Sequence, residues 1–112
     1  MLVSIIIPTH NRVKLLMNAI DSILKQTYEE FEIIVIDDAS NDKTQDFVLS
    51  IDDQRVKYFK NTINLYAAES RNIGIDKSKG ELIAFLDDDD EWFSYKLEKQ
   101  VHLFSNPKIG IV

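Results

Sequence analysis

Two kinds of hydrophobic pattern alternate along the chain. Runs of consecutive apolar residues are typical of buried parallel strands, whereas apolar residues at three- and four-residue spacing indicate amphipathic helices. The runs predict strands at residues 3–7, 31–36 and 82–86, and the start of another at 108–112. Alternating polar and apolar residues predict a strand with one solvent-exposed face at 55–59. The helical spacing predicts helices at residues 13–26, 43–51, 67–77 and 93–104.

This alternation predicts an α/β fold, a three-layer α/β/α arrangement around a mostly parallel sheet with right-handed crossovers. We expect residues 1–112 to form a single domain. Parallel strands end at the same edge of a sheet, and ligands bind in the crevice outside those ends. The loops at residues 8–12, 37–41 and 87–90 should therefore share one crevice.

The loop after the strand at 82–86 consists of four aspartates, Asp87 to Asp90. If the backbone stays extended there, Asp87 and Asp89 share one face, and Asp88 and Asp90 share the other. Such a pair of carboxylates suits Mg²⁺ or Mn²⁺, which take one or two protein carboxylates and leave other positions to water and phosphates. The simpler alternative is a solvated acidic turn that caps the next helix. The preceding strand and the second acidic pair, Asp37 and Asp38, favour the metal site.

Composition narrows the possible functions. The chain of 112 residues is 45% hydrophobic, which argues against disorder, and its net charge of −6 argues against nucleic acid as a partner. It has no cysteine, which excludes disulfides and thiol catalysis. No glycine-rich phosphate loop occurs, so a metal is the expected holder of a diphosphate. We expect a cytoplasmic protein, attached to a membrane only through parts of a longer natural chain.

Four sequence blocks resemble the family 2 glycosyltransferases, inverting enzymes with a GT-A nucleotide-sugar-binding fold. The blocks are residues 4–12 (SIIIPTHNR), 32–40 (EIIVIDDAS), Asn64 with 71–74 (RNIG), and 80–90 (GELIAFLDDDD). Their order and spacing match the amino-terminal, nucleotide-binding half of the family's catalytic domain. The resemblance implies transfer of a sugar from a nucleoside-diphosphate sugar to an acceptor hydroxyl, with inversion. The acceptor, a saccharide or a lipid-linked molecule, is left open.

The resemblance implies a nucleotide-binding role for several residues. Asp38 corresponds to the nucleobase contact. A carboxylate accepts from the N3–H of uracil but not from cytosine, which favours UDP, although thymine and guanine offer a similar donor. Pro8 and Thr9 correspond to the loop along base and ribose, and Arg71 to an arginine near base or phosphate.

The acidic run is assigned by the same resemblance. Asp89 corresponds to the direct ligand of Mn²⁺ or Mg²⁺, and Asp87 to the ribose- or metal-side member of the pair. Asp88 is assigned to the ribose, and Asp90 to the cap of the next helix. The metal would bridge the two phosphates and stabilise the departing diphosphate.

Two departures from the family pattern matter. Tyr66 stands where the family often has glycine, so that loop should differ in shape. The carboxylate that usually serves as general base comes well after the acidic run, and no residue here corresponds to it. Glu91 and Glu98 are assigned to a solvated helix face. An alternative function is therefore a nucleotide-sugar-binding fragment that transfers nothing.

Several residues have a simpler interpretation beside the functional one. His10 is expected to be a loop residue and not a base, and Trp92 to fill the rim of the core. Asp37 either accepts backbone amides of its loop or contacts ligand. Arg12 pairs either with phosphate or with an aspartate.

The loop after the first strand disfavours two rival functions. A nucleotidyltransferase would bring a basic, glycine-rich loop there, and a phosphoacceptor signalling domain would place its paired acids there. The chain has neither feature in residues 8–12. An exposed strand at 109–112 would favour a homodimer.

Overall fold

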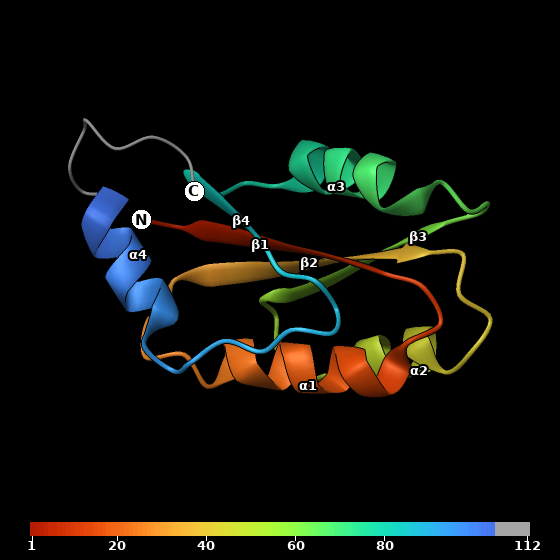
Figure 1. Ribbon diagram of the computed structural model, residues 1–112, viewed down its shortest axis with the longest axis horizontal. Helices are drawn as coiled ribbons and strands as arrows, with labels where there is room; N and C mark the ends of the chain where they lie inside the picture. The colour runs from red at the N-terminus through yellow and green to blue at the C-terminus, as the bar shows by residue number, and fades with distance from the viewer. Residues whose placement is uncertain (105–112) are drawn as a thin grey trace.

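The computed structural model describes residues 1–104, in which strands and helices alternate as predicted (Figure 1). The elements are β1 (Val3–Thr9), α1 (Val13–Leu24), β2 (Phe31–Asp38), α2 (Thr44–Leu49), β3 (Val56–Asn61), α3 (Tyr66–Lys77), β4 (Leu82–Phe85) and α4 (Lys96–Phe104). The strand predicted at 108–112 lies outside the described residues. None of these helices combines the length and hydropathy needed to cross a bilayer.

The four strands form one parallel sheet in the order β3-β2-β1-β4. The chain moves from β1 through β2 to β3 in one direction, then returns to the far side of β1 for β4. Right-handed crossovers in opposite directions place their helices on opposite faces. Accordingly α1 and α2 cover one face and α3 covers the other (Figure 1). The three-layer architecture is confirmed, and the reversal of direction creates a crevice beside the end of β1.

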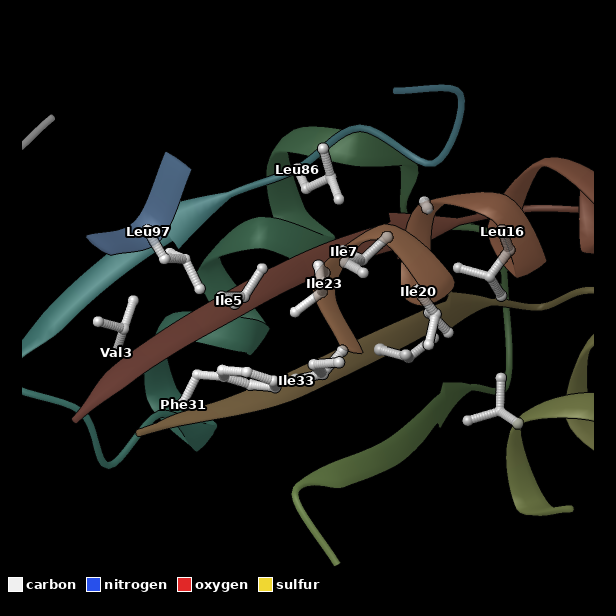
Figure 2. Close-up of a cluster of buried hydrophobic side chains, with 13 residues drawn as sticks. Val3, Ile5, Ile7, Leu16, Ile20, Ile23, Phe31, Ile33, Leu86 and Leu97 are labelled. Carbon is white, nitrogen blue, oxygen red and sulfur yellow. The ribbon is translucent and has the colours of Figure 1, made fainter. Parts of the chain in front are cut away.

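The larger core lies between the sheet and α1 (Figure 2). Alternate β1 residues Ile5 and Ile7 face α1, whereas Ile6 faces the smaller core under α3. The inner stripe of α1 is fully buried and consists of Leu16, Ala19, Ile20 and Ile23. Burying one such large apolar side chain contributes about 1.5–3 kcal/mol. These strands are therefore a rigid base for the loops at their carboxyl ends.

β1 continues through Pro8 to Thr9, so the predicted end of this strand at residue 7 is wrong. The Leu86 amide donates to the Ile6 carbonyl (3.1 Å), which shows that the backbone N–H and C=O groups of even-numbered β1 residues point toward β4. Pairing with β4 ends at Ile6, opposite Phe85. The backbone nitrogen of Pro8, which carries no hydrogen, therefore points to the side where β4 no longer pairs with β1. No ladder hydrogen bond is lost.

The predicted burial of β4 on both faces is also wrong for the described residues. Within residues 1–104 β4 is an outermost strand, its first three residues are half-buried, and Phe85 is 40% exposed. Gly74 packs closely against β1. A Cβ on Gly74 would lie 2.4 Å from Cγ2 of Ile6, so glycine lets α3 approach β1 closely.

Candidate functional site

A cleft of about 390 Å³ opens at the carboxyl ends of β1, β2 and β4, beside the first turns of α3. All of the residues predicted to bind nucleotide or metal line it: Pro8, Thr9, Asp38, Arg71, Asp87, Asp88 and Asp89. Its remaining lining residues are His10, Arg12, Ala67 and Ser70. Residues that are far apart in sequence thus meet in one cleft, with Asp38 contributed by β2 and the acidic run by the loop after β4.

The acidic run forms a turn, so the extended backbone that we considered for it is not formed. The Asp90 amide donates to the Asp87 carbonyl at 3.0 Å. The turn brings carboxylate oxygens of Asp87, Asp89 and Asp90 within 4.8 Å of one another, and all three residues are exposed. Asp90 therefore lies with the predicted metal pair and not on the opposite face. Three converging hard oxygen donors suit Mg²⁺ or Mn²⁺.

Asp88 points the other way and is only 7% exposed. Its Oδ2 accepts from the Thr9 hydroxyl (2.9 Å), and its Oδ1 accepts from Nη1 of Arg12 (3.3 Å). These bonds join the acidic turn to the loop after β1. Asp88 thus fixes the relative position of two walls of the cleft, and its predicted contact with ribose stays a prediction.

Two arginines flank the turn. Arg12 pairs with Asp88 and lies 3.8 Å from Oδ2 of Asp89, which bears out the aspartate alternative for Arg12. Nη2 of Arg71, on α3, lies 3.1 Å from Oδ1 of Asp87. Both guanidinium groups are partly exposed in the cleft and partly neutralise the turn.

Asp38 is almost buried, at 4% exposure, and its carboxylate is well satisfied by the protein. Oδ1 accepts from the amide of Leu65 (2.7 Å) and Nδ2 of Asn61 (3.0 Å), and Oδ2 accepts from the amide of Tyr66 (2.8 Å). Burial alone would raise the pKa of Asp38, but these hydrogen bonds outweigh it and hold the pKa below its usual range. A carboxylate has about four acceptor positions, so one remains for the predicted base contact.

Asp37 is fully buried and shapes the loop after β2, as one of its two interpretations predicted. Its Oδ1 accepts from the Ser40 amide (2.9 Å), and Oδ2 accepts from the Tyr58 hydroxyl. The pKa of Tyr58 is raised by burial and then by this hydrogen bond. Ala39, which precedes Ser40 in this loop, has a left-handed φ of 59°. Asp37 is not among the cleft-lining residues.

His10 lines the cleft and is fixed by both ring nitrogens. Nδ1 lies 2.5 Å from the Asp38 carbonyl, which can only accept, so Nδ1 carries the hydrogen. Nε2 lies 3.3 Å from Nδ2 of Asn11 and accepts from it. This arrangement agrees with the loop role predicted for His10, since Nδ1 joins the loop after β1 to the end of β2 and Nε2 bonds to a neighbour within the loop after β1.

Two cleft residues, Ala67 and Ser70, were not predicted from the sequence. Arg71 was predicted to reach the ligand from a helix, and the residue four positions earlier lies on the same face of such a helix. Helical spacing back from Arg71 was the signal that could have found Ala67. Ser70 is fully buried, and its hydroxyl accepts from Nδ2 of Asn61 (3.2 Å).

Comparison with known proteins gives a consistent result. The sequence model of Glycosyl transferase family 2 matches residues 4–112. An Escherichia coli protein named UDP-Glc:alpha-D-GlcNAc-diphosphoundecaprenol beta-1,3-glucosyltransferase WfgD is 40% identical over 99% of this chain, which covers 44% of that relative. A Campylobacter jejuni GalNAc(5)-diNAcBac-PP-undecaprenol beta-1,3-glucosyltransferase is 42% identical over 92% of this chain, which covers 37% of it. The chain thus spans less than half the length of these relatives.

Solved structures agree. The crystal structure of S. aureus TarS 1-349 in complex with UDP-GlcNAc superposes with a TM-score of 0.88 at 28% identity, covering 94% of this chain and 31% of that one. The mannosyltransferase PcManGT from Pyrobaculum calidifontis, in complex with GDP-Man and Mn²⁺, gives a TM-score of 0.86 at 26% identity, covering 96% of this chain and 33% of that one. The fold is GT-A, and the chain belongs to glycosyl transferase family 2.

Proposed function

We propose that the cleft binds a UDP-sugar and that the chain is the donor-binding half of an inverting, metal-assisted glycosyltransferase. The observation that carries the proposal is the meeting of Asp38 with the acidic turn in one cleft of about 390 Å³, within the size range of small-molecule sites. The base would lie at the Asp38 end and the diphosphate at the acidic end. Relatives named for UDP-Glc and a TarS complex with UDP-GlcNAc support uridine as the base.

Asp87 and Asp89 would hold Mn²⁺ or Mg²⁺, and the turn allows Asp90 to contribute as well. The fit rests on the converging carboxylate oxygens of these residues. When bound, such an ion supplies positive charge at the diphosphate as it leaves the sugar.

The chain's own residues would position the donor. Arg71 extends from α3 to Asp87, so its guanidinium lies beside the proposed diphosphate position and can donate to phosphate oxygens. Pro8 and Thr9 form the opposite wall along base and ribose. Asp88, held by Thr9 and Arg12, keeps this wall and the acidic turn at a fixed separation.

Transfer also needs a base that deprotonates the acceptor hydroxyl. Every carboxylate lining the described cleft either accepts hydrogen bonds from protein donors or belongs to the acidic turn. We therefore propose that the isolated chain binds the donor but transfers slowly or not at all, and that the whole protein acts on a lipid-linked saccharide. Relatives named for diphosphoundecaprenol acceptors support that acceptor class.

Calorimetric titration with UDP, with and without Mn²⁺, tests the binding proposal. We expect heat of binding with Mn²⁺ and at least a tenfold weaker affinity after chelation. GDP and dTDP, whose bases offer Asp38 a similar donor, are the matched ligands for measuring base selectivity. A folded sample that binds none of the three would refute the proposal. An assay for UDP release from UDP-glucose and UDP-GlcNAc separates a transferase from a binding fragment.

A further inference from the structure

The first residue of α3 is a tyrosine in a backbone conformation that favours glycine. Tyr66 has a φ of 69°, in the left-handed region. Its amide donates to Oδ2 of Asp38 (2.8 Å) and Oδ1 of Asn64 (3.2 Å), and the preceding Leu65 amide donates to Oδ1 of Asp38. These bonds fix the backbone whatever side chain residue 66 carries. A side chain with a Cβ costs free energy in this conformation, whereas glycine does not.

In the described fold, packing of the tyrosine ring does not offset the free-energy cost of this backbone conformation. The residue is 72% exposed, and its ring belongs to neither hydrophobic cluster. Within residues 1–104 its hydroxyl takes part in no hydrogen bond. Backbone strain that packing does not offset is characteristic of residues that act on a ligand.

Tyr66 lies beside the end of the cleft that we assign to the base. Its amide is bonded to Asp38, and the next residue, Ala67, lines the cleft. Tyr66 is not itself a lining residue, so its ring lies outside the cleft in this structure. Exposed side chains change rotamer in picoseconds to nanoseconds, so the ring is free to move over the cleft when a ligand is bound.

We propose that Tyr66 is a nucleobase-binding residue whose ring closes over the bound base and stacks on its face. This inference rests on the proposed function, because it needs a base at the Asp38 end. Every base offers a π-face, so the contact adds affinity without selecting uracil. It would confine the nucleotide between α3 and the loop after β1.

Three substitutions at Tyr66 separate the effect of the ring from the effect of the backbone strain. Tyr66→Gly removes both, Tyr66→Ala removes the ring and keeps the strain, and Tyr66→Phe keeps both. Calorimetry with Mn²⁺ should show UDP affinity falling roughly tenfold for the glycine and alanine variants and staying within twofold for phenylalanine. Thermal unfolding should show a midpoint a few degrees higher for glycine than for alanine. Tyr95→Ala, which removes an exposed aromatic ring outside the cleft on the segment before α4, is the matched control for binding and should leave UDP affinity unchanged.

Inorganic pyrophosphate with Mn²⁺ distinguishes base stacking from a general loss of structure. A stacking ring predicts weaker UDP binding and unchanged pyrophosphate binding in Tyr66→Gly and Tyr66→Ala. If either variant binds UDP as the parent does, or loses both ligands equally, the inference is refuted while the proposed function stands. If the parent itself binds no nucleotide, the proposed function fails and this inference fails with it.

Discussion

Asp38→Asn should lower the stability of the chain by about 2–3 kcal/mol. In the parent the carboxylate accepts from Leu65, Asn61 and Tyr66 on both of its oxygens. An amide retains one acceptor oxygen, and its NH₂ group would face the Tyr66 or the Leu65 amide, donor against donor. Losing one charge-assisted hydrogen bond costs about 1.5–3 kcal/mol, and the remaining bonds weaken when the acceptor becomes neutral. For a domain of this size that corresponds to a melting midpoint lower by roughly 10 °C.

Urea unfolding followed by circular dichroism measures this difference directly, and pH provides a second check. The folded-state pKa of Asp38 is lowered, so its stabilising contribution is present above the ordinary value of 3.8 and is lost as pH falls through the folded value. The difference in free energy of unfolding between the parent and Asp38→Asn should therefore have its full size at pH 7 and become smaller below pH 3.8. Asp89→Asn is the matched control, because Asp89 is 54% exposed and its loss relieves repulsion. Equal unfolding midpoints for parent and Asp38→Asn at pH 7 would refute the reasoning.

Three further changes test other parts of the structure. Asp89→Asn and Asp87→Asn should each weaken Mn²⁺-dependent UDP binding at least tenfold in calorimetry without lowering the melting midpoint; a lower midpoint would indicate a structural role. Gly74→Ala should destabilise by about 1–3 kcal/mol in urea, since the new Cβ meets Ile6 at 2.4 Å, and an unchanged midpoint would contradict the close packing. Glu32→Gln should cost about 2–3 kcal/mol, because the buried carboxylate accepts from Ser4, Lys57 and the Lys79 amide; destabilisation that persists unchanged at pH 3 would argue against a charge effect.

The order and type of the elements could be predicted from the sequence because each pattern reports burial directly. The inner stripe of α1 and the β-branched runs of β1 and β2 are buried as their periodicity implies. Predicting that the site residues lie together needed only one more rule, that parallel strands end at the same edge of a sheet. The patterns were less informative at β4, whose apolar residues are only half-buried because, within the described residues, β1 pairs with one side of β4 and no strand lies on its other side.

Side-chain direction within the site could not be predicted, because it depends on turns that the local sequence specifies weakly. Four consecutive aspartates give no sign of where the backbone bends, and a single turn moves Asp90 to the side of Asp87 and Asp89. The partners of Asp38 were equally invisible, since two of the three donors are backbone amides of a loop 27 or 28 residues away. Whether a carboxylate faces ligand or protein is decided by such distant amides.

The charge balance at the acidic turn connects its structure to the proposed function. Four carboxylates, Asp87 to Asp90, face two guanidinium groups, those of Arg12 and Arg71, which leaves a formal charge of −2. Asp88 is the buried member and is paired with Arg12, so the excess lies on the exposed carboxylates that converge. A divalent cation would balance that excess, and Arg71 would then be free to turn toward phosphate oxygens. Because Asp88 is bonded to Thr9 and Arg12, the turn should keep its shape when the charge is neutralised, so under the proposed function the diphosphate would meet a site that is already formed.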